Sequence, residues 1–486
     1  MPAVFRLTPS ARLDPYGLRP PGIPAISRTQ VLSYSLENPL IAAASDEIEA
    51  MDATLQQARF AWVPTIRTRT LVAPGVATSC EDLQIQVTNP TTNAQRTEDF
   101  QYCRPRNGVD IDTIGGYFDQ IAHAGITVRV SAEMVVPIYT FGKIKSAKAL
   151  ATAGKALAVL NRERLRQETS LRVYQAYATL LLARESITIL EEAWQVIQEA
   201  RISVEKDLGM GEDPDEEENL DRDPADIMRI ELGEFEIEER LLEARKIEAL
   251  SLAALWALAG EAAPPGFDIK DTELLPDTVQ SGMRTGDYYR DLAARERPEA
   301  KMAGGAVELR KAVERLQRAN FLPDIGLLVS AGYAYSSSAD PSMSALYYND
   351  RYNYSRVLVA LGMTWNLDFH NHVFRLRKAR AKRRAAEHQH QAALLILGLE
   401  VDKAYRELMQ AQRAIDLTAK ASKKARQLVV DLQVKETVGG GNLKELQRSL
   451  TTWAEWRFKH FQAIMQHNIA LAQLARAVGV PLVASQ

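Results

Sequence analysis

Two hydrophobic patterns follow one another in residues 125–207. Over 125–136 apolar and polar residues alternate, which predicts a β-strand of about ten residues, the length that crosses a bilayer when the strand is tilted. We expect Pro137 to end this strand, because proline has no N–H for the ladder. After Gly142 the apolar period becomes seven, with two series offset by three: Val173, Leu180, Ile187 and Trp194, and Ala176, Ala183, Leu190, Ile197 and Val204. This pattern predicts one long helix with a coiled-coil seam.

The same order of elements occurs twice along the chain. Matching residues keep their order in both halves, and a smaller separation late in the repeat indicates a shorter loop between the second pair of strands. The matched residues are Asn38-Pro39 and Arg297-Pro298, Pro64 and Pro323, and Val173–Tyr177 and Val401–Tyr405.

We therefore expect an extended lead-in over 1–29, a first repeat over 30–286 and a second repeat over 287–486. The first repeat is predicted as a helix, a strand pair around a long cysteine-containing polar loop (73–124), a long helix, an acidic tip, a helix and a connector. The second is predicted as a helix, a strand pair, a long helix, a glycine-rich tip and a helix.

The second repeat has the clearer strands, over 325–335 and 357–365, with aromatic residues near their ends. Aromatic girdles of this kind are typical of membrane β-barrels, and the alternative is the edge of an ordinary sandwich. The four strands expected in one chain are too few to close a barrel, and lipid tolerates no open sheet edge. Several copies must therefore pool their strands.

Composition adds limits. The 486 residues carry a net charge of −3, and no basic patch with interleaved aromatic residues points to nucleic acid. No run of eighteen apolar residues predicts a transmembrane helix. Cys80 and Cys103 lie in one predicted loop, which fits a local disulfide in an oxidising compartment; two free thiols are the alternative. No export signal is visible in 1–29, which are rich in proline and lack a basic segment followed by an apolar run.

No catalytic or cofactor motif emerges from the sequence. There is no glycine-rich phosphate loop, nucleophile elbow or Cys-x-x-Cys pair. The pairs His370-x-His372 and His388-x-His390 are discounted as metal ligands, because helical residues two apart point to different faces. We expect neither an enzyme nor a bound metal or cofactor.

The pattern over about residues 30–480 resembles the TolC family of outer-membrane efflux proteins. The resemblance depends on the duplicated Asn/Arg-Pro segments, on the order of all these motifs, and on three further stretches: Val136–Gly142 at the strand-to-helix corner, Gly441-Asn442 at the second tip, and Leu471–Gly479 at the end. It implies a mainly α fold with membrane β-strands, in which a homotrimer forms a 12-stranded β-barrel continued by a coiled-coil α-helical barrel.

The resemblance also implies a function and partners. The protein would be a passive exit duct in the outer membrane that extends into the periplasm. It would dock on a periplasmic adaptor protein and an inner-membrane pump, in tripartite efflux or type I secretion. Drugs, metals and polypeptides all remain open as cargo.

Residue roles follow from the resemblance at the two helix turns, which would form the periplasmic entrance. The residues that correspond to adaptor-docking turns are Leu208, Gly209, Asp226, Val438, Gly439 and Gly440. Glu445 and Arg448 correspond to lumen-facing carboxylates of the gate, and only Glu445 keeps the negative charge, which puts a cation-binding acidic ring in doubt. The acidic insertion in 210–223 either adds negative potential at this entrance, selecting an adaptor or cationic cargo, or is a solvated turn.

A coiled-coil scaffold outside membranes is the competing interpretation. It accounts for the heptads and for the absence of a visible export signal. It does not account for four amphipathic strands placed symmetrically in two repeats, and whether the apolar strand faces meet lipid distinguishes the two.

Overall fold

The computed structural model describes residues 24–75, 78–88, 95–105, 125–207, 225–279, 282–337, 353–437 and 443–480. These residues divide between two compact units, each with segments from both halves of the chain. The helical unit comprises the described parts of Met1–Asp52, Ala153–Glu308 and Arg384–Gln486, and the sheet unit those of Ala53–Thr152 and Leu309–Arg383.

Helices make up most of the described structure. They are α1 (Arg28–Ser35), α2 (Pro39–Arg59), α4 (Lys143–Asp207), α5 (Ala225–Ala259), α6 (Gly286–Glu296), α7 (Pro298–Ala319), α8 (Phe369–Thr437) and α9 (Leu443–Val478). A short 3-10 turn, Gly260–Ala262, follows α5. Among the helices that the structure describes, none is both long enough and apolar enough to cross a membrane.

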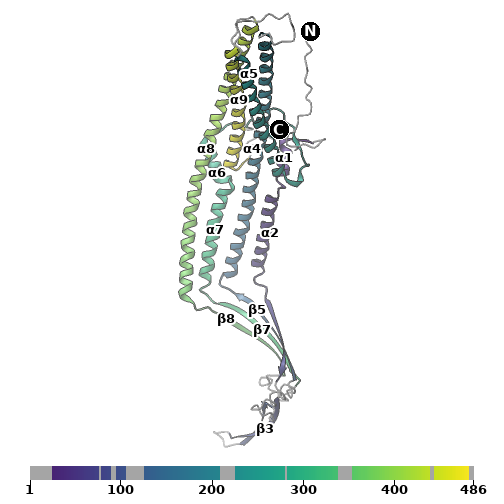
Figure 1. Ribbon diagram of the computed structural model, residues 1–486. Helices are drawn as coiled ribbons and strands as arrows, with labels where there is room; N and C mark the ends of the chain where they lie inside the picture. Colours follow the sequence, from purple (N-terminus) through teal and green to yellow (C-terminus); the bar gives the residue numbers. More distant parts are fainter. Residues whose placement is uncertain are drawn as a thin grey trace. The chain divides into compact units, whose positions relative to one another are not determined.

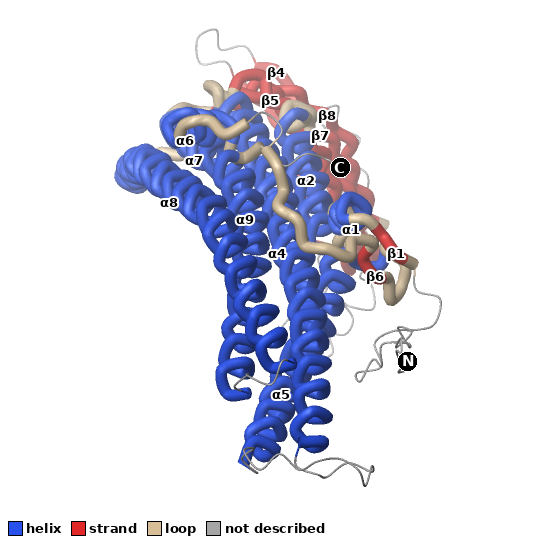
Figure 2. The backbone as a smooth tube through the Cα atoms, turned by 90° about the horizontal axis from the view of Figure 1, so that it is seen from above, coloured by secondary structure: helices blue, strands red, loops and turns tan. Residues whose placement is uncertain are grey.

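The core of the helical unit lies along the predicted seam. Val173, Leu180 and Val204 on α4 are completely buried. The first two pack against α5, α9 and the connector after α5, whereas Val204 packs in a second cluster with residues of α5, α8 and α9. Figure 2 shows α4, α5 and α9 running side by side in this unit. The heptad prediction for the helix is therefore confirmed.

Proline marks where each short helix gives way to a longer one. Ser27 caps α1 in a reciprocal capping box with Gln30, and α2 begins at Pro39. Between them Asn38 donates from Nδ2 to the carbonyl oxygen of Leu258 (3.0 Å) and accepts from the backbone N–H of Leu40 (3.0 Å). The side chain of Asn38 thus fixes the helix break to the end of α5.

The second repeat makes the corresponding break with Arg297, between α6 and α7. Here α9 ends at Gly479 with φ +85°, a conformation that favours glycine. A Cβ on Gly479 would lie 2.7 Å from the Cα of Arg297, so the end of α9 packs directly on this break.

The sheet unit is built on four antiparallel strands in the order β2 (Thr65–Gly75), β5 (Gly125–Tyr139), β7 (Asp324–Ser336), β8 (Tyr354–Thr364). Figure 1 draws β5, β7 and β8 as neighbouring strands. The four strands predicted from alternation are all present. A separate two-stranded parallel sheet pairs β1 (Ala25–Ile26) with β6 (Asp268–Ile269) in the helical unit.

Two expectations for the first strand pair were wrong. The predicted loop over 73–124 contains a hairpin of β3 (Thr78–Thr88) and β4 (Gln95–Pro105). The expected end of the strand at Pro137 is also incorrect, since β5 runs on to Tyr139 through a register shift. Pro137 stands opposite Gly326, whose missing Cβ leaves room for the carbonyl oxygen of Val136, so the bulge accommodates the absent N–H.

Candidate functional site

The register of the sheet determines which side chains share a face, because opposed residues in an antiparallel pair project to the same side. Met134 stands opposite Ile66 on one neighbouring strand and Val329 on the other, and Val329 stands opposite Val359. Extending these rows gives one face with no charged residue: Ile66, Thr68, Thr70, Val72, Pro74, Ile126, Val128, Val130, Ala132, Met134, Val136, Ile325, Leu327, Val329, Ala331, Tyr333, Tyr335, Ser355, Val357, Val359, Leu361 and Met363.

The opposite face, called here the polar face, carries every charged residue of these four strands. They are Arg67, Arg69, Arg129, Glu133, Asp324 and Arg356. Small and polar residues such as Ser131, Ser330 and Gly332 lie between them. Every charged residue of the four-stranded sheet therefore lies on one face, which also carries a few apolar residues such as Val135, Leu328 and Leu358.

Among the described residues, the apolar face is most exposed on the edge strand β8. Val357 is 73% exposed and Leu361 is 72% exposed. A contiguous apolar surface of this kind is rare on soluble monomers and marks a membrane or partner contact.

Aromatic residues lie near both ends of the apolar face. Tyr333 and Tyr335 are near the end of β7, whereas Tyr139 and Trp365 are at the opposite end of the sheet. The bulge after Pro137 pairs Tyr139 with Ile325, which places Tyr139 on the apolar face. This arrangement resembles the two interfacial girdles of a membrane barrel.

The strand-to-helix corner after β5 has a special backbone. Phe141 (φ 47°) and Gly142 (φ 86°) are both left-handed, and the aromatic rings of Tyr139 and Phe141 meet edge to face at 4.6 Å. Lys143 begins α4 and forms an ion pair of 2.8 Å with Asp324, the first residue of β7. The corner thus links the start of the long helix to the sheet.

The second corner, after β8, uses side chains in place of glycine. Asn371 donates to a carboxylate oxygen of Asp368 at 2.6 Å, and this hydrogen bond is the main cause that lowers the pKa of Asp368. Trp365 donates from Nε1 to the carbonyl oxygen of Phe321 at 3.0 Å. The corner without proline or glycine is therefore held by hydrogen bonds.

The outer edges of the sheet carry β2 and β8, and among the described strands neither has a partner on its outer side. Each successive pair is antiparallel, so β2 and β8 run in opposite directions. An edge β8 of one copy placed beside an edge β2 of another would continue the antiparallel order.

The helix ends next to the two predicted docking turns converge in the helical unit. One apolar cluster contains Val204 of α4, Ile230 of α5, Leu432 of α8 and Leu446 of α9. Arg201 adds a polar link between α4 and α5, with an ion pair to Glu234 at 2.9 Å. The last turns of α4 and α8 and the first turns of α5 and α9 therefore lie at the same end of the unit.

Most of the predicted docking residues, Leu208, Gly209, Val438, Gly439 and Gly440, lie outside the described residues, as does the acidic insertion. Asp226 falls in the first turn of α5. Glu445 and Arg448 are both exposed on α9, whereas Leu446 between them is buried. Glu445 and Arg448 thus face away from the apolar cluster.

The predicted cysteine pair lies in the β3–β4 hairpin. Cys80 stands directly opposite Cys103 in the register. Directly opposed residues in an antiparallel pair have Cα atoms about 4.5–5.5 Å apart, within the range of a disulfide. The backbone is therefore compatible with the predicted bond, which stays a prediction.

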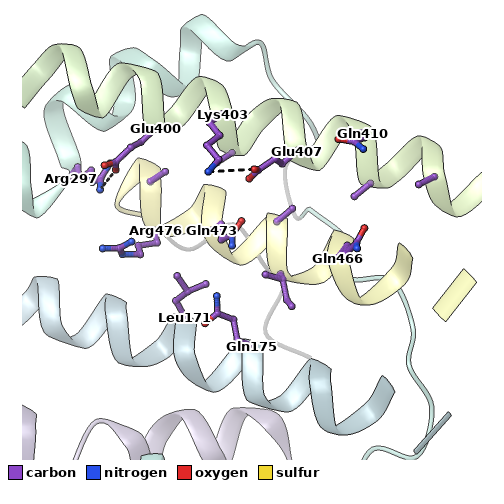
Figure 3. A pocket seen from close by; sticks show the side chains of 16 residues that line it. Leu171, Gln175, Arg297, Glu400, Lys403, Glu407, Gln410, Gln466, Gln473 and Arg476 are labelled. Carbon is purple, nitrogen blue, oxygen red and sulfur yellow. Dashed lines mark ion pairs between the residues drawn. The ribbon is translucent and has the colours of Figure 1, made fainter. Parts of the chain in front are cut away.

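A polar groove in the helical unit lies beside the Arg297 break and is lined by residues of α4, α8 and α9 (Figure 3). Arg297 is only 3% exposed and contacts Glu400 at 2.6 Å and Glu299 at 3.1 Å. Lys403 faces Glu407 at 3.8 Å. Oppositely charged side chains are paired along this groove, which indicates a structural junction between helices.

The two histidines of the first pair, His370 and His372, have different surroundings. His372 is buried against the ring of Phe321, whereas His370 is exposed beside Asp368. Within the described residues, no group of three His, Cys, Asp or Glu residues is placed to hold a metal ion.

Like the exposed apolar face of the sheet, comparisons with known proteins indicate a protein of the outer membrane. Residues 290–480 match the family described as outer membrane efflux protein. The predicted resemblance to the outer-membrane efflux proteins is confirmed. The alkaline protease secretion protein AprF of Pseudomonas aeruginosa is 27% identical over 219 residues. That match covers 43% of this chain and 41% of AprF, less than half the length of either protein.

Solved outer-membrane proteins share the fold. The Campylobacter jejuni CmeC outer membrane channel aligns with a TM-score of 0.69 at 13% identity, covering 94% of this chain and 87% of CmeC. The outer membrane protein VceC of Vibrio cholerae aligns with a TM-score of 0.67 at 16% identity, covering 94% and 96%. The matched family consists of transport conduits and not of enzymes.

Proposed function

We propose that this protein is an outer-membrane exit duct, through which substrates pass passively from a pump and adaptor complex to the exterior. The observation that carries this proposal is the sheet in which every charge lies on one face while the other is apolar and exposed. Apolar-out and polar-in alternation is what a β-barrel wall needs in lipid. A coiled-coil scaffold has no use for such a sheet.

The edges of the sheet support assembly from several copies. Joining β8 of one copy to β2 of the next keeps all pairs antiparallel and removes both edges. Three copies, as in the family resemblance, would give a closed 12-stranded barrel. Rotational symmetry closes such a head-to-tail ring.

The helices offer a second contact between copies. One stripe of α5 exposes large apolar side chains at helical spacing, although α5 also contributes to the buried core: Met228, Leu232, Phe235, Leu242 and Leu250. Packing against the helices of a neighbouring copy would bury this stripe. The trimer would therefore be held together in both units.

The partners we propose are a periplasmic adaptor and an inner-membrane pump, with docking at the turns that contain Leu208-Gly209 and Val438–Gly440. The convergence of α4, α5, α8 and α9 near these turns supports a shared docking end. Deleting 210–223 tests the acidic insertion: weaker adaptor binding would support a docking role, and unchanged binding and transport would reject it.

The mass and shape of the detergent-extracted protein test the duct directly. We expect light scattering to give three copies in the protein component, and negative-stain images to show a hollow particle with a detergent belt. A monomer or dimer that remains in solution without detergent would contradict the proposal and favour the scaffold.

A further inference from the structure

The polar face is unequally charged. It carries Arg67, Arg69, Arg129 and Arg356, against Glu133 and Asp324. Asp324 lies at the start of β7, where Lys143 of α4 neutralises it at 2.8 Å. The remaining charges on this face are therefore mostly positive.

Two of these arginines stand in one row across all four strands. Arg69 is opposite Ser131, Ser131 is opposite Gly332, and Gly332 is opposite Arg356. The outer strands thus supply long cationic side chains, and the inner strands supply small residues between them.

The surroundings of Arg356 hold its guanidinium over the sheet. Its Cζ lies 4.6 Å from the ring centroid of Tyr354, a cation–π contact on the same face. A Cβ on Gly332 would meet the ring of Tyr354 at 3.2 Å and Nε of Arg356 at 3.6 Å. Glycine at position 332 therefore makes room for the arginine and its ring.

Among the described residues, neither Arg69 nor Arg356 forms an ion pair with a carboxylate. The neighbouring rows differ: Arg67 stands directly opposite Glu133, and Arg129 stands opposite Leu71 and Ala334. The positive potential of the polar face is therefore strongest around the Arg69–Ser131–Gly332–Arg356 row.

We propose that this row forms a basic ring inside the barrel that selects for anionic cargo and anions. The inference depends on the proposed duct, because the polar face must line the lumen. Closing the barrel with several copies repeats both arginines around the lumen, and rings of Arg or Lys side chains are the usual means by which pores favour anions.

The test measures the local potential at the row. Ser131→Cys, with Cys80 and Cys103 replaced by serine, places a thiol between the two arginines. Its reaction rates with negatively and positively charged methanethiosulfonate reagents are compared in the membrane-inserted assembly. The ratio of the anionic to the cationic reaction rate is then measured again in a variant that also carries Arg69→Gln and Arg356→Gln. It is measured separately in a variant that carries Glu133→Gln.

We expect the double arginine variant to lower the ratio of anionic to cationic reaction rates by at least about two-fold. Glu133→Gln, a matched change of opposite sign on the same face, should raise it. An unchanged ratio in the double variant would overturn the basic ring. A thiol that reacts with neither reagent in an assembled trimer would also overturn it, since the row would not face the lumen. Failure to form the trimer at all would instead contradict the proposed duct.

Discussion

The two units of this chain bury their apolar residues in different ways. In the helical unit the seam of α4 is packed within the chain, and Val173, Leu180 and Val204 are completely buried. In the sheet unit residues of equal hydrophobicity, such as Val357 and Leu361, are mostly exposed although they belong to a regular strand. The helical unit therefore has a core of its own, whereas the exposed apolar residues of the sheet fit a contact with lipid or with another protein.

We expect the largest effect from an arginine placed on the apolar face of the sheet. Val359 and Leu358 are neighbours on β8 with similar exposure, 60% and 53%, but they lie on opposite faces. We expect Val359→Arg to cost about 2–4 kcal/mol of membrane stability, and Leu358→Arg to cost far less. The fraction of each variant retained in urea-washed membranes measures this. Equal retention of the two variants would mean that lipid does not contact the apolar face.

A side chain at Gly479 should disturb the helical unit by a smaller amount. Its φ of +85° and the 2.7 Å approach to the backbone of Arg297 leave no room for a Cβ. We expect Gly479→Ala to cost about 2 kcal/mol, since an L-residue pays about 1–2 kcal/mol in this conformation before any clash. Thermal unfolding followed by circular dichroism in detergent gives the change in Tm.

Gly398→Ala is the matched control. A Cβ at Gly398 in α8 would lie 4.0 Å from Cδ of Arg290, which is an ordinary contact. Alanine there should leave Tm unchanged or raise it, because alanine favours the helix by about 0.5–1 kcal/mol over glycine. A similar loss for both variants would show that the close packing at Gly479 is unimportant.

A buried ion pair network joins α7 and α8 in the sheet unit. Glu314 is buried and accepts from Arg318 (2.6 Å) and Arg383 (2.8 Å). Burial alone would raise the pKa of Glu314, but the hydrogen bonds and the positive charges of Arg318 and Arg383 together outweigh it and lower the pKa.

A carboxyl group with a lowered folded pKa stabilises the protein above its unfolded pKa, and this contribution is lost as the pH falls through the folded value. We expect Glu314→Gln to cost about 1 kcal/mol at neutral pH and to weaken the acid-side fall of Tm. Arg318→Gln should reproduce part of the change. An unaltered pH profile of Tm in Glu314→Gln would show that this ion pair network does not contribute to stability.

The smallest effect on assembly is expected from the cysteines. If Cys80 and Cys103 form the predicted bond, alkylation without reductant should leave the mass unchanged, and reduction should expose two thiols. Because the β3–β4 hairpin is a sheet separate from the four strands, Cys80→Ser should not change the number of copies in the assembly. Loss of the assembly in this variant would contradict that separation.

Sequence periodicity revealed most of this arrangement, because both periods are read from single segments. The heptads of α4 and the alternation of β8 need no knowledge of a partner. The β3–β4 hairpin was missed although Leu83, Ile85 and Val87 alternate with glutamines, since the surrounding segment is polar. That short alternation was the available signal.

Other features depend on contacts that no single segment contains. The extension of β5 beyond Pro137 needs Gly326 on the neighbouring strand. The row that unites Arg69 with Arg356 appears only when the register of three strand pairs is known, because the two residues lie in different repeats. The charge on one face of a sheet thus depends on which residues the strand register brings together.

The most direct test of the central claim is a scan of spin labels along β8 in liposomes, from Val357 to Met363, with both native cysteines replaced by serine. The account predicts a period of two: labels at 357, 359, 361 and 363 are accessible to oxygen dissolved in lipid, and labels at 358, 360 and 362 to a water-soluble paramagnetic reagent. Labels that show no alternation, or that are all reached from water, would contradict a sheet with one face in lipid and the other lining a duct.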